Sequence, residues 1–84
     1  MRSHHDVEYK HLPAILRELR ASAGLTQRAL SAELGEPQSW VHNCETGERR
    51  VDVAEFVAWA RACGASPRGA LDRYLRVLAA HGRG

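Results

Sequence analysis

The sequence predicts an all-α fold, a compact domain of five helices. Apolar residues recur with the 3.6-residue period of amphipathic helices along most of the 84 residues. Glycines and capping residues separate these segments, and no segment shows the alternation of a half-buried strand. The domain is expected at residues 8–81, after a polar segment, 1–7, for which disorder stays open, and before a tail, 82–84.

The first two helices carry apolar stripes that end at glycines. Pro13 fits the first turn of the first helix, where a missing backbone N–H removes no hydrogen bond, and Gly24 closes this helix. Thr26 is a preferred N-cap residue and begins the second helix, which Gly35 ends. The expected buried faces are Leu12, Ile15, Leu16 and Leu19 in the first helix, and Ala29, Leu30 and Leu34 in the second.

Capping residues also mark the starts of the other three helices. Pro37 fits the first turn of the third helix. Asp52 precedes the fourth, and Glu55 follows it at the spacing of a capping box. Ser66 and Pro67 form an N-cap and first-turn pair for the fifth. The expected stripes are Val41 and Cys44 in the third helix, Phe56, Val57, Ala60 and Cys63 in the fourth, and Leu71, Tyr74, Leu75 and Leu78 in the fifth.

The composition excludes several classes of protein. Twelve basic and ten acidic residues give a formal charge of +2, too small for a polybasic protein that coats nucleic acid. Eleven of the basic residues are arginines, which suit bidentate contacts to phosphate, although a GC-rich genome produces the same bias. No apolar run approaches the ~18 residues of a membrane span, so we expect a cytoplasmic protein without a membrane partner.

No catalytic, metal or cofactor site is expected. Cys44 and Cys63 form no CxxC pair and are expected to be buried free thiols. His4 and His5 have no cysteine or histidine partners at metal-ligand spacing. His42 lies two residues from Cys44, on another side of the helix, so the two form no catalytic dyad. We expect no enzyme, and five helices leave no room for a separate ligand-binding or catalytic domain.

Residues 24–50 carry the most informative pattern. Two short helices joined by a tight turn with a glycine form a helix-turn-helix, at about residues 26–46, whose second helix can lie in a DNA major groove. The outward positions of that helix are neutral hydrogen-bonding residues, where a purely structural helix more often carries charged pairs. Glutamine and asparagine match the adenine edge, and serine and neutral histidine bond other base edges. These outward residues are Gln38, Ser39, His42 and Asn43.

The ordered motif resembles the phage repressor/Cro-type helix-turn-helix family, also called the xenobiotic response element type. The resemblance rests on Leu25-Thr26-Gln27, Leu30, Leu34 to Val41 and Glu45 to Arg50, and it runs from about Glu8 to Leu71. It implies a lambda-repressor-like fold and a sequence-specific DNA-binding regulator. The implied protein is a small dimeric repressor that reads a pseudopalindromic operator in double-stranded DNA, in a bacterial or phage setting, nucleoid-associated when bound.

The resemblance also implies roles for individual residues. Arg20 and Glu45 occupy positions that form an internal salt bridge in the family. Trp40 departs from the small polar residues common at its position, and we expect it to pack at the helix edge. The base-reading positions are Gln38, Ser39 and Asn43, with His42 as a fourth, and the implied phosphate contacts are Gln27, Arg28, Arg49 and Arg50.

Two features leave alternatives open. The segment from Thr26 to Arg50 contains three arginines and four glutamates, so non-specific DNA affinity and its salt dependence should both be weak. The alternative is therefore a protein-interaction module of the antitoxin or antiactivator type. Its partner would be a regulatory protein, and its DNA binding would be secondary or lost. The stripe of the fifth helix, Leu71, Tyr74, Leu75 and Leu78, either folds back onto Phe56 and Trp59 or forms a homodimer interface, which we favour.

Overall fold

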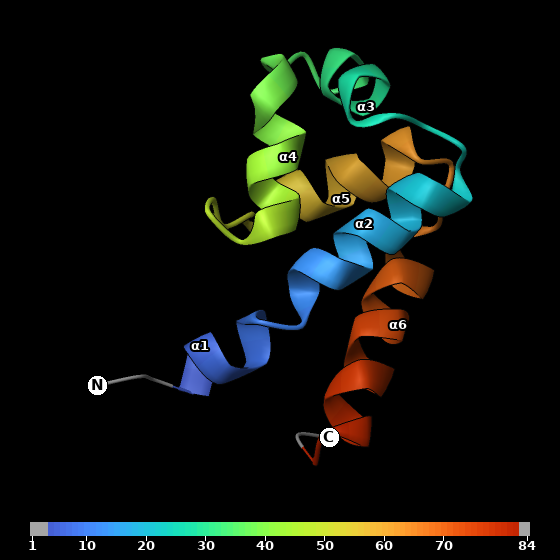
Figure 1. Cartoon of the computed structure of the whole chain (residues 1–84). Helices are drawn as coiled ribbons and strands as arrows, with labels where there is room; N and C mark the ends of the chain where they lie inside the picture. The colour runs from blue at the N-terminus through green and yellow to red at the C-terminus, as the bar shows by residue number, and fades with distance from the viewer. Residues whose placement is uncertain (1–3, 83–84) are drawn as a thin grey trace.

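The computed structural model describes residues 4–82, and it is helical over that range without a strand (Figure 1). The all-α prediction is confirmed, and the five expected helices are present as α2 to α6. A further short helix, α1, includes part of the polar segment 1–7; residues 1–3 and 83–84 and the side chains of His4, His5 and Asp6 lie outside the described part. None of the described helices is long and apolar enough to cross a membrane. The helices are α1 (His4–Tyr9), α2 (Leu12–Ser22), α3 (Gln27–Glu33), α4 (Gln38–Thr46), α5 (Val53–Ala62) and α6 (Pro67–Ala80).

The predicted caps set the helix starts. The Thr26 hydroxyl accepts a hydrogen bond from the third backbone N–H of its helix, at 3.0 Å. Asp52 and Glu55 form the complete capping box, with reciprocal side-chain to backbone bonds of 2.7 and 2.9 Å. Ser66 caps α6 in the same way as Thr26 caps α3. Pro37 stands at the N-cap of α4 and not inside its first turn.

Two tyrosines attach α1 to the rest of the domain. The Tyr74 hydroxyl on α6 donates to the carbonyl oxygen of Glu8 at 2.8 Å. The Tyr9 hydroxyl accepts from the backbone N–H of Val51 at 2.8 Å, and the Arg50 guanidinium lies 3.9 Å from the centre of the Tyr9 ring. Burial raises the pKa of Tyr74. Helix α1 is thereby connected both to α6 and to the loop that follows α4.

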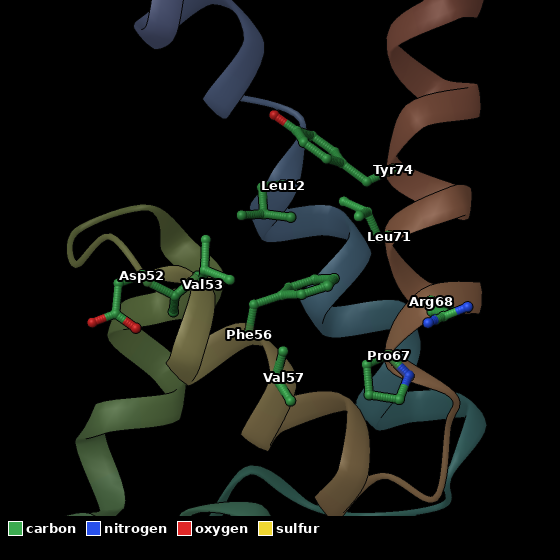
Figure 2. Close-up of a pocket in the computed structure, with 10 residues that line it drawn as sticks. Leu12, Asp52, Val53, Phe56, Val57, Pro67, Arg68, Leu71 and Tyr74 are labelled. Carbon is green, nitrogen blue, oxygen red and sulfur yellow. The ribbon is translucent and has the colours of Figure 1, made fainter.

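An apolar groove of about 340 Å³ runs between α2, α5 and α6 (Figure 2). Val53 at one edge is 80% exposed, and Leu71 at the opposite edge is 47% exposed. Leu75, one turn further along α6, is 51% exposed, whereas Leu78 is buried inside the domain. Of the four residues expected at a dimer interface, Leu71 and Leu75 therefore face solvent and Tyr74 is half-buried. The groove is lined by Leu12, Val51, Asp52, Val53, Phe56, Val57, Pro67, Arg68, Leu71 and Tyr74.

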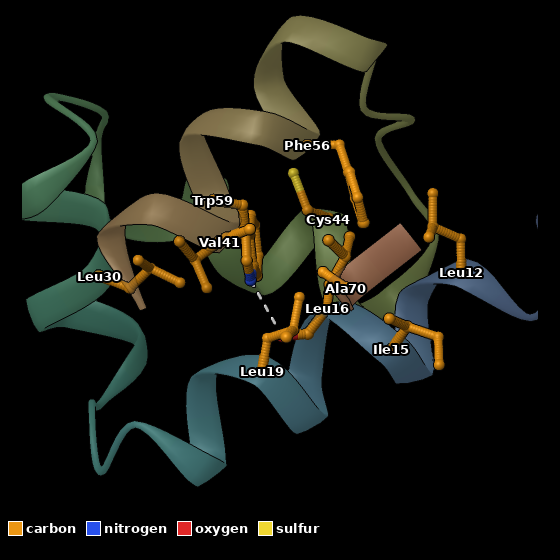
Figure 3. Packing of buried hydrophobic residues seen from close by; sticks show 11 residues of the cluster. Leu12, Ile15, Leu16, Leu19, Leu30, Val41, Cys44, Phe56, Trp59 and Ala70 are labelled. Carbon is orange, nitrogen blue, oxygen red and sulfur yellow. Dashed lines mark hydrogen bonds between the residues drawn. The ribbon is translucent and has the colours of Figure 1, made fainter. Parts of the chain in front are cut away.

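Trp59 occupies the centre of the core (Figure 3). Its side chain is fully buried, and its indole Nε1 donates to the carbonyl oxygen of Leu16 at 3.0 Å. The expected stripe of α5 omitted this residue. The core comprises Leu12, Ile15, Leu16, Leu19, Leu30, Val41, Cys44, Phe56, Trp59, Ala60 and Ala70.

Several expected core residues are only half-buried. Val57 and Cys63 turn partly toward the surface because Trp59 takes the inward direction of α5. In α3 only Leu30 of the expected stripe is fully buried, and Ala29 and Leu34 lie at its margin. Both cysteines are free thiols, as expected, although only Cys44 is fully buried. Burial raises the pKa of both thiols.

We predict that Trp59→Phe lowers the free energy of unfolding by about 1–3 kcal/mol, because it removes packing volume and the indole hydrogen bond. Trp59→Ala should lower it by about 3–5 kcal/mol. Urea denaturation followed by circular dichroism measures both. Exposed Arg61→Ala is the control and should change the value by less than about 0.5 kcal/mol; equal effects of Arg61→Ala and Trp59→Phe would contradict the central role of Trp59.

Candidate nucleic-acid interface

Helices α3 and α4 pack against each other across a short turn. Gly35 adopts a φ of 69°, a left-handed conformation that favours glycine, and it lets the chain reverse directly after α3. Ser31 is buried, and its hydroxyl donates to the backbone carbonyl of Gln38 at 3.2 Å. Leu30 and Val41 are both fully buried between the helices. These contacts hold α4 at a defined angle to α3, with its other side facing solvent.

The solvent side of α4 carries the residues expected to read bases. Gln38, Ser39 and His42 are exposed, and they line one open hollow together with Gln27 from the start of α3. We call this the reading hollow; its volume is about 480 Å³. Asn43 is half-buried and does not line it. The structure thus brings together three of the four expected base readers and adds Gln27 to them.

Glu45 is the hub that connects α4 to α2 and α3. Its carboxylate accepts from Arg20 Nε at 2.6 Å and Nη2 at 3.0 Å, a bidentate ion pair. The Gln27 amide Nε2 donates to the same carboxylate at 3.0 Å. Arg20 also donates to the carbonyl oxygen of Leu25 at 2.9 Å. The hydrogen bond to Glu45 raises the pKa of Arg20, and the Glu45 side chain is only 3% exposed.

Gln27 consequently has a role that sequence reasoning missed. The resemblance assigns it to phosphate contact, whereas one of its amide hydrogens is used inside the protein. Gln27 and Glu45 are separated by 18 residues, so no local pattern signals this bond. A second amide hydrogen and the amide oxygen remain for the reading hollow.

The loop arginines are held against the protein surface. Arg49 makes a bidentate pair with Glu55, at 3.1 and 2.8 Å, and its guanidinium lies 4.8 Å from the centre of the Trp40 ring. The pKa of Glu55 is lowered, chiefly by its hydrogen bonds from Arg49 and to a smaller extent by the one from the Asp52 backbone N–H. The hydrogen bonds to Glu55 in turn raise the pKa of Arg49. The Arg49 side chain is still 41% exposed. Arg28 is exposed, and within residues 4–82 it forms no ion pair.

Trp40 packs at the edge of α4, as expected. Its ring centre lies 6.0 Å from that of Trp59, with the two rings tilted by 38°, and the Arg49 guanidinium also lies over the Trp40 ring. The side chain is half-buried and extends the core toward the loop. Trp40 therefore connects the position of α4 to the position of Arg49.

Comparison with known proteins shows similarity to helix-turn-helix proteins. Residues 11–73 match the family described as helix-turn-helix domain, a range that includes all of α3 and α4. Among solved structures the chain is similar to an XRE-family like protein from Pseudomonas syringae pv. tomato str. DC3000, with 41% identity and a TM-score of 0.78. That alignment covers 87% of this chain and 89% of the other. No curated protein matches the sequence.

We predict that Glu45→Ala lowers the free energy of unfolding by about 3 kcal/mol, because it leaves the Arg20 guanidinium without its partner in a largely buried position. Urea denaturation measures the change. Glu48→Ala, at an exposed glutamate just beyond α4, is the matched control and should have an effect below about 0.5 kcal/mol. A loss below about 1 kcal/mol for Glu45→Ala would contradict the hub role.

The Arg49–Glu55 pair predicts a dependence of stability on acid. The pKa of Glu55 is lowered in the folded protein. The ion pair therefore contributes fully to the stability of the fold at pH values above about 4.3, the ordinary pKa of a glutamate. The contribution is lost as the pH falls through the lowered folded pKa. Glu55→Gln should therefore destabilise the protein at pH ~7 and approach the wild-type stability at pH ~3. Urea midpoints at both values test this, and a constant difference would exclude it.

Proposed function

Because the chain belongs to the XRE-type helix-turn-helix family of DNA-binding regulators, we propose that it is a sequence-specific transcriptional repressor that inserts α4 into the DNA major groove. The reading hollow carries this proposal. It collects neutral hydrogen-bonding side chains on one exposed face, where nothing in the core requires them. Base edges in the major groove present donors and acceptors that such side chains can match.

Individual base readers follow from side-chain chemistry. Gln38, at the first position of α4, projects from the end of the helix that enters the groove in this family. Gln38 and Asn43 can each form two hydrogen bonds with an adenine, and such a pair is worth about 1–3 kcal/mol of discrimination. Ser39 and His42 lie between them and can bond several base edges.

The phosphate contacts are proposed at the borders of this face. Arg28 extends into solvent beside Gln27, whose remaining amide hydrogen can reach a phosphate oxygen. Arg49 and Arg50 border the other end of α4. Their contacts to Glu55 and Tyr9 place the loop before DNA arrives, which lowers the conformational entropy lost on binding.

We further propose that the repressor is a homodimer that uses the apolar groove. Apolar surface gathers there in the described chain, on Val53, Leu71 and the neighbouring Leu75. A two-fold dimer buries the same patch twice and can present two α4 helices ~34 Å apart on a pseudopalindrome. The alternative is a protein-interaction module of the antitoxin or antiactivator type, and the same groove favours it by offering a hydrophobic surface to another protein.

We predict that Gln38→Ala/Asn43→Ala abolishes sequence-selective binding. Removing two bidentate contacts should weaken the preferred duplex by roughly 100-fold or more while non-specific binding persists. The preferred duplex is first obtained by selecting bound sequences from a random DNA pool. Fluorescence anisotropy then compares it with a scrambled duplex, and circular dichroism checks the fold. Selection of no sequence by the wild type, together with a tight protein partner, would support the interaction module instead.

The dimer is tested by adding charge to the groove. Leu71→Glu and Leu75→Glu place a carboxylate on exposed positions, so the monomer should fold and the dimer should dissociate. Sedimentation velocity at tens of micromolar protein measures the change. Arg61→Glu, on the exposed side of α5, is the control and should leave the dimer intact. A wild-type protein that sediments as a monomer would exclude the dimer.

A further inference from the structure

A second open hollow lies beside α2, on the side where this helix passes α4. Its volume is about 460 Å³. A Cβ on Gly47, at the end of α4, would lie 3.8 Å from Cγ of Pro13, so the start of α2 is close to the end of the recognition helix. Because it contains two basic side chains, we call it the basic hollow. Its lining residues are Lys10, Pro13, Ala14, Arg17, Glu18, Ala21 and Glu45.

The basic hollow has two cations that no carboxylate of the described chain neutralises. Lys10 and Arg17 are exposed, and neither takes part in an ion pair within residues 4–82. Glu45 is occupied by Arg20 and is almost inaccessible. Glu18 is 3.7 Å from Arg73 on α6, which compensates its charge. Lys10 and Arg17 therefore both lack a carboxylate partner among the described side chains.

Small side chains separate these two cations. Pro13, Ala14 and Ala21 project little from α2, so a bulky group can approach the helix between Lys10 and Arg17. The basic hollow and the reading hollow are neighbours, because a hydrogen bond joins one lining residue of each. Gln27 lines the reading hollow, Glu45 lines the basic hollow, and the two side chains are joined at 3.0 Å. A strand that borders the bases read by α4 and passes Gln27 can thus continue along α2.

We propose that Lys10 and Arg17 form an additional phosphate-binding site that holds the DNA backbone strand next to the bases read by α4. This inference rests on the proposed function and extends its contact surface to α2. The two cations position the duplex without reading sequence, because phosphates are the same at every base pair. The site compensates for the loop arginines, of which Arg49 is already paired with Glu55.

The double variant Lys10→Ala/Arg17→Ala tests the site. Anisotropy titrations of the selected duplex between about 50 and 200 mM salt give the slope of log K, the association constant, against log salt concentration. In the double variant this slope should become shallower by about 0.9 per lost phosphate contact, roughly 1.8 in total. Affinity at the lowest salt should fall on the order of tenfold. The ranking of mutated duplexes should stay that of the wild type, since no base contact is removed.

Two controls complete the experiment. Lys10→Arg/Arg17→Lys keeps both charges and should retain the wild-type slope. Arg61→Ala removes an exposed arginine of α5 that lies outside the apolar groove and forms no ion pair with the described side chains, and it should also leave the slope unchanged. If the wild type binds its selected duplex and Lys10→Ala/Arg17→Ala keeps the full slope, this inference alone is wrong. If the wild type selects no duplex, the proposed function and this inference are both wrong.

Discussion

The carboxylate of Glu45 determines where α4 stands. It lies on α4, yet its bonds go to Arg20 on α2 and Gln27 on α3, so one side chain fixes three helices relative to one another. A carboxylate that is 3% exposed is stable only if its lost hydration is replaced, and the three nitrogen donors do this. The ion pair with Arg20 also compensates the negative charge of Glu45 beside the face of α4 that is proposed to contact DNA.

A second set of contacts extends this rigidity to the loop beyond α4. Trp40 contacts both the buried Trp59 and the Arg49 guanidinium, and Arg49 in turn pairs with Glu55 in the first turn of α5. The loop is therefore connected to the core through an aromatic ring and to α5 through an ion pair. Side chains that are positioned before binding lose less conformational entropy when a ligand arrives.

Local signals account for what the sequence could predict. Thr26, Asp52 and Ser66 act on N–H groups three residues away, so their effect is visible in any short window. Trp59 and α1 were missed because their environment is tertiary: the indole bonds a carbonyl 43 residues away, and the Tyr74 hydroxyl meets Glu8 across 66 residues. In the site, the outward face of α4 was predictable from periodicity. The bond of Gln27 to Glu45 and the pairing of Arg49 with Glu55 could not be predicted in this way, since both depend on how separate segments pack together.

In the proposed function, the distribution of charge favours discrimination between DNA sequences over strength of binding. Non-specific affinity depends on how many phosphates a protein neutralises. Arg20 and Arg49 are paired with carboxylates of the protein, and the segment from Thr26 to Arg50 has more glutamates than arginines, so the helix-turn-helix itself carries little net positive charge, and the proposed contacts of Lys10 and Arg17 lie outside it. Base contacts by neutral side chains add affinity only at matching sites. In the proposed function, such a surface raises the ratio of specific to non-specific binding, and the proposed second copy on a two-fold site adds affinity because its binding becomes intramolecular.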